Sequence, residues 1–137
     1  MEATQADLIV TGVSPSVLEL ADGKLDGHVK QRNPIGSNLH GEALKENVVI
    51  VGIPTGTADD NSVFDAVTNW LNRNRNALIE CDANKTLEFY TYLQPDIGSR
   101  ILTIPNSLIQ IAAELNLNVA NQAIRILTED EYNKLKR

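Results

Sequence analysis

The sequence predicts an α+β fold, a two-layer sandwich in which a mostly antiparallel sheet carries two main helices on one face. Short β-branched or alternating segments recur along the 137-residue chain, and such segments are typical of strands. Two longer segments carry apolar residues at helical spacing, and each follows a short loop. This order folds most simply as one sheet with the helices on one side, in a ferredoxin-like arrangement. A doubly wound parallel α/β sheet is the alternative.

The first half of the chain predicts two strands and a short helix. Residues 7–13 are rich in β-branched side chains and predict a strand. Ser14-Pro15-Ser16 indicates a helix start with Pro15 at the first helical position, and Asp22-Gly23 ends this helix. Val48–Ile53 is apolar on both faces, which is typical of a central buried strand.

Residues 22–46 predict a long Gly-rich loop. They include Gly23, Gly27, Gly36 and Gly41, and they contain at most a short strand near Leu25–Arg32. Loops of this length in a compact domain are often functional or mobile. This loop is therefore the first place to look for a binding surface.

The second half predicts two main helices and two strands. An amphipathic helix is expected over residues 62–80, with several possible N-caps at Asp59, Asp60, Asn61 and Ser62. Ser62 and Asp65 resemble a capping box. Thr86–Leu93 alternates apolar and polar residues, as a half-exposed antiparallel strand does. A helix over 105–115 and a strand over 117–127 follow. The apolar stripe of the first helix consists of Val63, Phe64, Val67, Trp70, Leu71 and Leu78.

The sequence predicts a single domain over residues 1–137 that ends in a short helix. Thr128 and Glu131 form a capping box that predicts a short C-terminal helix over 128–137. Hydrophobic residues make up 42% of the chain and charged residues 22%, which is ordinary globular usage. No repeat or second domain is present in the sequence.

The charge of the chain narrows its classes of partner. The net charge is −6, and the basic residues are scattered, so we expect no nucleic-acid binding. No apolar run reaches the ~20 residues of a membrane helix, so we expect no membrane partner. The single cysteine, Cys81, allows no internal disulfide and indicates a reducing, cytoplasmic compartment. An acidic surface suits a basic protein partner, and a homo-oligomer is a further option.

Two histidines in the Gly-rich loop offer a possible metal site. Asp26-Gly27-His28 and His40-Gly41-Glu42 form a mirrored pair. If the loop folded back on itself, Asp26, His28, His40 and Glu42 would supply two imidazoles and two carboxylates to a Zn-type ion. Their separation matches no standard metal-binding spacing, and loop residues in solvent are the alternative. No cofactor is expected otherwise.

The strand over 86–93 offers a protein-binding patch. Glu88, Tyr90 and Tyr92 share one face of this strand, and tyrosines beside carboxylates suit protein interfaces. Packing across strands is the alternative. Lys30 and Arg32, the nearest approach to a basic cluster, are also binding candidates.

Residues 63–127 resemble an uncharacterised bacterial family with a small α+β sandwich. The resemblance follows the helix from Val63, the strand Leu87–Leu93, the segment Leu102–Ile109, the helix residues Ala112–Leu115 and a closing strand. Some members of that family are thought to lie near toxin–immunity genes. The resemblance implies the fold and carries over no functional residue.

These observations favour a non-enzymatic protein-binding domain of immunity, inhibitor or anti-defence type. No set of catalytic residues with a known spacing is present, and opposite charges steer an acidic inhibitor to a basic target. A small-molecule-binding or regulatory domain, with residues 22–46 as a lid, is the first alternative. A metal-dependent hydrolase that uses Asp26, His28, His40 and Glu42 is the second.

Overall fold

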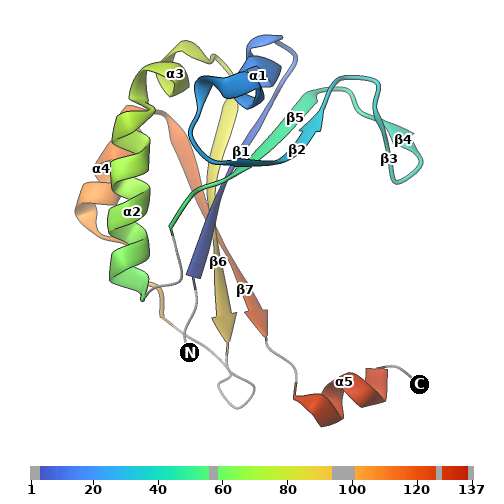
Figure 1. The fold of residues 1–137 in the computed structure, drawn as a ribbon, viewed down its shortest axis with the longest axis vertical. Helices are drawn as coiled ribbons and strands as arrows, with labels where there is room; N and C mark the ends of the chain where they lie inside the picture. The colour runs from blue at the N-terminus through green and yellow to red at the C-terminus, as the bar shows by residue number, and fades with distance from the viewer. Residues whose placement is uncertain (1–3, 56–58, 94–100, 126–127, 136–137) are drawn as a thin grey trace.

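Five strands form one sheet, and helices cover one of its faces (Figure 1). The computed structural model describes residues 4–55, 59–93, 101–125 and 128–135. The elements in chain order are β1 (Thr4–Gly12), α1 (Ser16–Glu19), β2 (His28–Asn33), β3 (Asn38–Leu39), β4 (Glu42–Ala43), β5 (Asn47–Gly52), α2 (Asp60–Arg73), α3 (Arg75–Glu80), β6 (Asn84–Leu93), α4 (Asn106–Glu114), β7 (Leu117–Arg125) and α5 (Glu129–Leu135).

The strand order is β2-β5-β1-β6-β7. The first three neighbouring pairs are antiparallel, and β6 and β7 are parallel. The prediction of an α+β fold with a mostly antiparallel sheet is confirmed. The doubly wound alternative is wrong, because among the described strands only β6 and β7 run in parallel.

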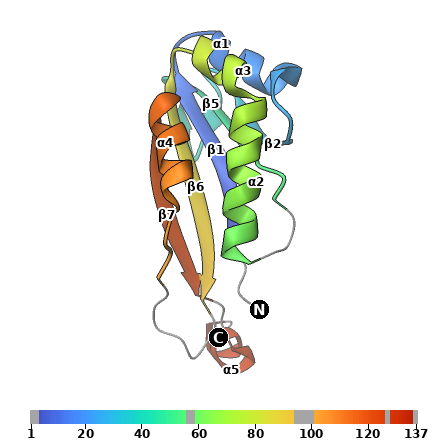
Figure 2. The same cartoon turned by 90° about the vertical axis from the view of Figure 1, so that its left-hand side faces the viewer.

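The core lies between the sheet and its two main helices, α2 and α4 (Figure 2). The predicted stripe of α2 and α3 is buried from Val63 to Leu78. Phe64 of α2 meets Phe89 of β6 edge to face, with ring centroids 5.3 Å apart. Such aromatic pairs add to the stabilisation that burial gives. The stripe therefore attaches α2 to the middle of the sheet.

The predicted helix over 62–80 is wrong in one respect, because it breaks at Asn74 into α2 and α3. The Asn74 amide nitrogen donates to the carbonyl of Trp70 at 2.8 Å, and its oxygen accepts from the backbone N–H of Asp26 at 3.2 Å. The backbone hydrogen bonds at this point are kept, from the Asn74 N–H to the Trp70 carbonyl and from the Leu78 N–H to the Asn74 carbonyl, each at 3.1 Å. The Asn74 side chain therefore links the segment that precedes β2 to the end of α2.

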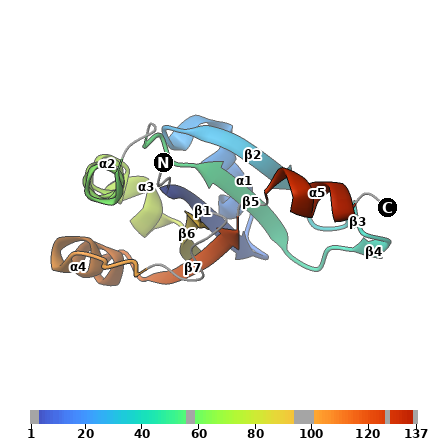
Figure 3. The same cartoon turned by 90° about the horizontal axis from the view of Figure 1, so that it is seen from below.

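Residues 22–46 contain one expected strand and one hairpin that the sequence did not predict. The short strand expected near Leu25–Arg32 is β2, at the edge of the sheet. Beyond it, β3 and β4 form a hairpin whose base is closed by two backbone hydrogen bonds of 2.9 Å, between Gly36 and Leu44 and between Leu44 and Ser37. The hairpin and α5 lie on the side of the sheet away from α2 and α4 (Figure 3).

The helix ends show which caps are used. Asp59 caps α2 by accepting from the backbone N–H of Ser62 at 2.9 Å, so the predicted capping box at Ser62 is wrong. This hydrogen bond lowers the pKa of Asp59. The capping box of Thr128 and Glu131 at α5 is confirmed. Residues 126–127 and 136–137 of the predicted last strand and tail helix lie outside the described residues.

None of the helices in the described ranges is long and apolar enough to cross a membrane.

Candidate functional site

The face of the sheet opposite α2 and α4 carries the strand side chains that do not enter the core, and we call it the open face (Figures 1 and 3). Strand alternation places one half of the side chains of β1, β5 and β6 in the core and the other half here. The open face consists of Gln5, Asp7, Ile9, Thr11, Val48, Ile50, Gly52, Thr86, Glu88, Tyr90 and Tyr92, together with Asn118, Ala120, Gln122 and Ile124 of β7. Glu88, Tyr90 and Tyr92 share this face, as the sequence predicts.

One row of residues crosses the open face through its most polar point. The strand registers align His28 of β2, Gly52 of β5, Asp7 of β1, Glu88 of β6 and Ala120 of β7. The row brings two carboxylates onto directly opposed positions of β1 and β6. Asp7 is only 4% exposed although it lies on the open face, because neighbouring side chains cover it.

Lys30 covers and neutralises Asp7. Its ammonium nitrogen lies 2.8 Å and 3.1 Å from the two oxygens of Asp7. The register of β2 shifts between Val29 and Gln31, and this bulge directs Lys30 across the sheet. A Cβ atom on Gly52 would lie 3.1 Å from Cε of Lys30. The glycine therefore opens the path along which the lysine reaches β1.

Tyr90 lies next to both carboxylates of the row. Burial, together with the charges of Glu88 and Asp7 and hydrogen bonding to them, raises the pKa of Tyr90 to about 12. At neutral pH its phenol therefore stays protonated and acts as a donor. Tyr92 donates from its hydroxyl to the side-chain oxygen of Gln5 at 3.3 Å. These contacts hold both rings against the sheet, so neither tyrosine is fully exposed.

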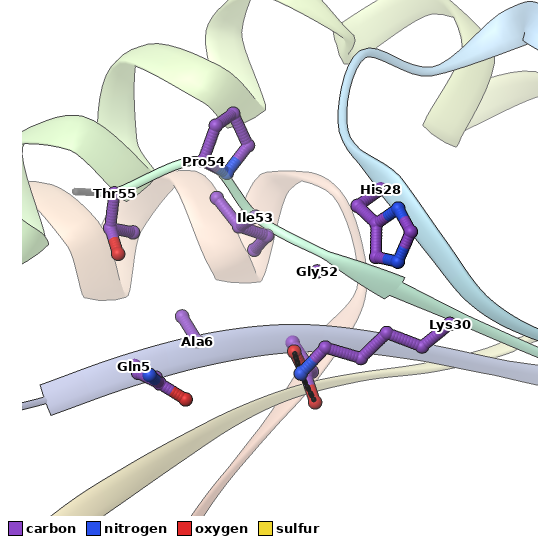
Figure 4. A pocket seen from close by; sticks show the side chains of 9 residues that line it. Gln5, Ala6, His28, Lys30, Gly52, Ile53, Pro54 and Thr55 are labelled. Carbon is purple, nitrogen blue, oxygen red and sulfur yellow. Dashed lines mark hydrogen bonds and ion pairs between the residues drawn. The ribbon is translucent and has the colours of Figure 1, made fainter.

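A shallow pocket of about 360 Å³ adjoins this row where β5 ends (Figure 4). Figure 4 shows His28 and Lys30 on one side of it and Gln5 and Ala6 of β1 on another. The pocket is lined by Gln5, Ala6, Asp7, His28, Lys30, Gly52, Ile53, Pro54 and Thr55. Its charged groups are the ion pair already described. The polar side chains of this lining can bind polar groups.

Arg32 is separated from Lys30. It forms a two-pronged ion pair with Asp22, with contacts of 2.9 Å and 3.1 Å. This hydrogen bonding raises the pKa of Arg32. The basic pair expected from the sequence is therefore two separate ion pairs, one with a buried acid and one with an exposed acid.

The four candidate metal ligands are not brought together. His28 lies at the start of β2, whereas His40 and Glu42 lie in the β3–β4 hairpin beyond the other end of that strand (Figure 1). Asp26 pairs with Arg73 at 3.8 Å, and its carbonyl accepts from the indole of Trp70 at 2.6 Å. Within the described ranges, no group of three or more His, Cys, Asp or Glu side chains could hold a metal ion. The predicted set is wrong because β2 separates its members.

Cys81 is buried at the end of α3 and is 2% exposed. Its sulfur lies 3.7 Å from the hydroxyl of Ser16. Nearby, the buried ammonium of Lys85 donates to the carbonyls of Leu78 at 2.9 Å and Cys81 at 2.8 Å. This lysine therefore caps the last turn of α3 from inside the fold.

Sequence reasoning missed Asp7 and Gly52. A single carboxylate in an otherwise apolar strand was the available signal for Asp7, because it alternates with Ala6 and Leu8, which are buried. Gly52 carries no such signal, since its role depends on the neighbouring strand.

Comparisons with models of protein families, with curated proteins and with solved structures found no match. The chain's own geometry therefore carries the functional argument.

Proposed function

We propose that this protein is a non-enzymatic binding domain that engages a basic protein partner through the open face of its sheet. The observation that carries the proposal is Glu88 with Tyr90 and Tyr92 beside it, on the face of the sheet opposite α2 and α4. Tyrosines that pair an apolar ring with a polar tip are enriched at protein interfaces.

The charge distribution supports a basic partner. Among the described residues, five cations already pair with acids of the same chain, and Lys85 is buried. These pairs are Lys24–Glu19, Lys30–Asp7, Arg32–Asp22, Arg73–Asp26 and Arg75–Glu114. The chain's net charge is −6, so the acids outside these pairs dominate its surface. An acidic surface of this kind speeds encounter with a basic protein.

The immunity, inhibitor or anti-defence type is the narrower part of this proposal. The resemblance of residues 63–127 to a family with members near toxin–immunity genes supports it. We also infer the ferredoxin-like arrangement, which the strand order β2-β5-β1-β6 supports. In that arrangement α4 and β7 extend the basic unit by one strand. A cytoplasmic location is part of the same proposal.

Capture of partners from a lysate of the source organism tests the proposal. We expect a basic protein in about equal molar amount, with retention that falls as salt rises. Glu88→Gln should weaken capture several-fold. Glu80→Gln is the matched control, because it removes the same charge from an exposed residue at the end of α3, away from the open face. Equal retention by both variants, or no basic partner at all, would contradict the proposal.

A small-molecule-binding or regulatory role is the second candidate, and the pocket beside Asp7, His28 and Lys30 favours it. Its volume of about 360 Å³ lies at the lower end of ordinary ligand sites. A thermal-shift screen of polar metabolites tests this role. A ligand present at about 100 times its Kd should stabilise the protein by about 2.7 kcal/mol. No shift across the library would remove this candidate for common metabolites.

A further inference from the structure

The outer edge of β7 is an uncovered strand edge. Residues 118–123 are all exposed, and β7 pairs only with β6 among the described strands. Every second residue of an edge strand turns its backbone N–H and C=O outward, where another strand can pair with them. Nine residues at about 3.3 Å each give this edge a length of about 30 Å.

This edge lacks the features that usually prevent pairing. The segment Leu117–Ile124 contains no charged residue and no proline. Its register with β6 runs without a bulge through nine residue pairs, from Lys85↔Leu117 to Leu93↔Arg125. Natural edge strands are commonly protected by lysines, prolines or bulges. The long, regular and neutral edge of β7 is therefore suited to pairing.

The helix beside β7 is also nearly free of charge. From Ile101 to Ile124 the only charged residue is Glu114, which pairs with Arg75 at 2.9 Å. α4 packs along β7 (Figure 2), and Ile109 and Val119 are 49% and 40% exposed. In a chain of net charge −6, this is a surface on which two copies can meet with little repulsion.

We propose that β7 pairs with β7 of a second copy of this chain, antiparallel and about a two-fold axis near Asn121. The two sheets then form one ten-stranded sheet, and α4 lies beside its counterpart. Antiparallel pairing over this length supplies about eight backbone hydrogen bonds between the copies. A second copy is the occupant because each neutral edge meets an identical neutral edge, as a two-fold interface requires. This interface goes beyond the proposed function and leaves both open faces uncovered.

Sedimentation of the full chain over a wide dilution series tests the interface. We expect a dimer that dissociates on dilution. Asn121→Lys and Asn121→Asp should each give a monomer, because identical charges would then face each other across the axis. An equal mixture of the two variants should restore the dimer at low salt. Gln31→Lys, which adds the same charge at the β2 edge, should leave the dimer unchanged.

Hydrogen exchange of the unmodified chain gives a second measurement that needs no variant. Amides of β7 should exchange faster as the protein is diluted, while those of β2 should not change. A chain that stays monomeric at every concentration would overturn the proposal. So would a dimer that survives Asn121→Lys, a mixture of variants that stays monomeric, or β7 protection that appears only when a different protein is added.

Discussion

The two edges of the sheet are built in opposite ways. β2 is held by side chains: the indole of Trp70 and the amide of Asn74 bind the segment just before it, and Lys30 reaches inward to Asp7. β7 is held by an unbroken backbone ladder with β6 and by packing against α4. β2 is bulged and carries Lys30 and Arg32, whereas β7 is regular and carries no charge before its last residue, Arg125.

This difference indicates that the two edges have different roles. Long-range side-chain contacts fix β2 in one position, and its bulge and charges discourage pairing with another chain. The ladder of β7 requires no particular side chain along its outer edge. Because β6 and α4 hold β7 from its inner side, its outer edge can accept a partner strand without losing this support. This contrast supports the two proposals, recognition by the open face and self-association through the β7 edge.

The largest expected effect comes from removing the anchor of β2. Trp70 is fully buried, and its indole nitrogen donates to the carbonyl of Asp26. Trp70→Ala should lower the free energy of unfolding by about 3–5 kcal/mol, because it leaves a cavity and a carbonyl without its donor. Urea denaturation measures the loss, and hydrogen exchange should show β2 losing protection before β7.

A matched change at β7 should have almost no effect. The amide of Asn118 donates to the exposed side chain of Asn84 at 3.1 Å, so Asn118→Ala should stay within about 0.5 kcal/mol of the parent. A loss at Asn118 as large as that at Trp70, or unchanged exchange at β2, would show that both edges are held in the same way.

Replacing the two cations of β2, Lys30 and Arg32, should give stability losses of intermediate size. Lys30→Met leaves the buried carboxylate of Asp7 without its cation, and we expect a loss of about 1–2 kcal/mol in the free energy of unfolding. Arg32→Met breaks an ion pair with the exposed Asp22, and should cost at most about 0.5–1 kcal/mol. Denaturation of both variants at low and high salt checks the order. Equal losses would mean that the burial of Asp7 contributes nothing.

The smallest expected effect is the alkaline behaviour of Tyr90. Its folded pKa of about 12 lies above the value of about 10 of an unfolded tyrosine. The contribution of the neutral phenol is therefore fully present below about pH 10 and is lost as the pH rises through about 12. Because the ring is partly exposed, we expect under about 1 kcal/mol. Tyr90→Phe should make stability less dependent on pH in this window; an unchanged alkaline loss would place its cause elsewhere.

The spacing of apolar and polar residues was sufficient to predict which side chains share one face of a strand or helix. The alternation of Glu88, Tyr90 and Tyr92 placed them on one face, and the stripe from Val63 to Leu78 identified the buried side of its helices. Features set by contacts between distant segments were not predictable. The helix breaks at Asn74, whose side chain forms hydrogen bonds with Trp70 and Asp26. No local pattern in the sequence predicts those contacts.

The candidate site was predictable in part for the same reason. Asp7 and Glu88 become neighbours only through the register of β1 with β6, and Lys30 pairs with Asp7 beside Gly52, where a Cβ atom would lie 3.1 Å from Cε of the lysine. The metal set was wrong because mirrored sequence suggested proximity, whereas a strand of extended chain separates His28 from His40. Residue type drew attention to Tyr90 and Glu88, but the strand register determines which residues they neighbour.

The burial of Cys81 gives this protein a built-in reporter of its own opening. The chain has one cysteine, and its thiol lies under Ser16 at the end of α3. A thiol reagent can react only when this end of the domain opens, so the labelling rate measures the frequency of that event without an added probe. Because α1 and α3 meet there, a change in the labelling rate on addition of a partner would show that binding elsewhere alters how often these two helices separate.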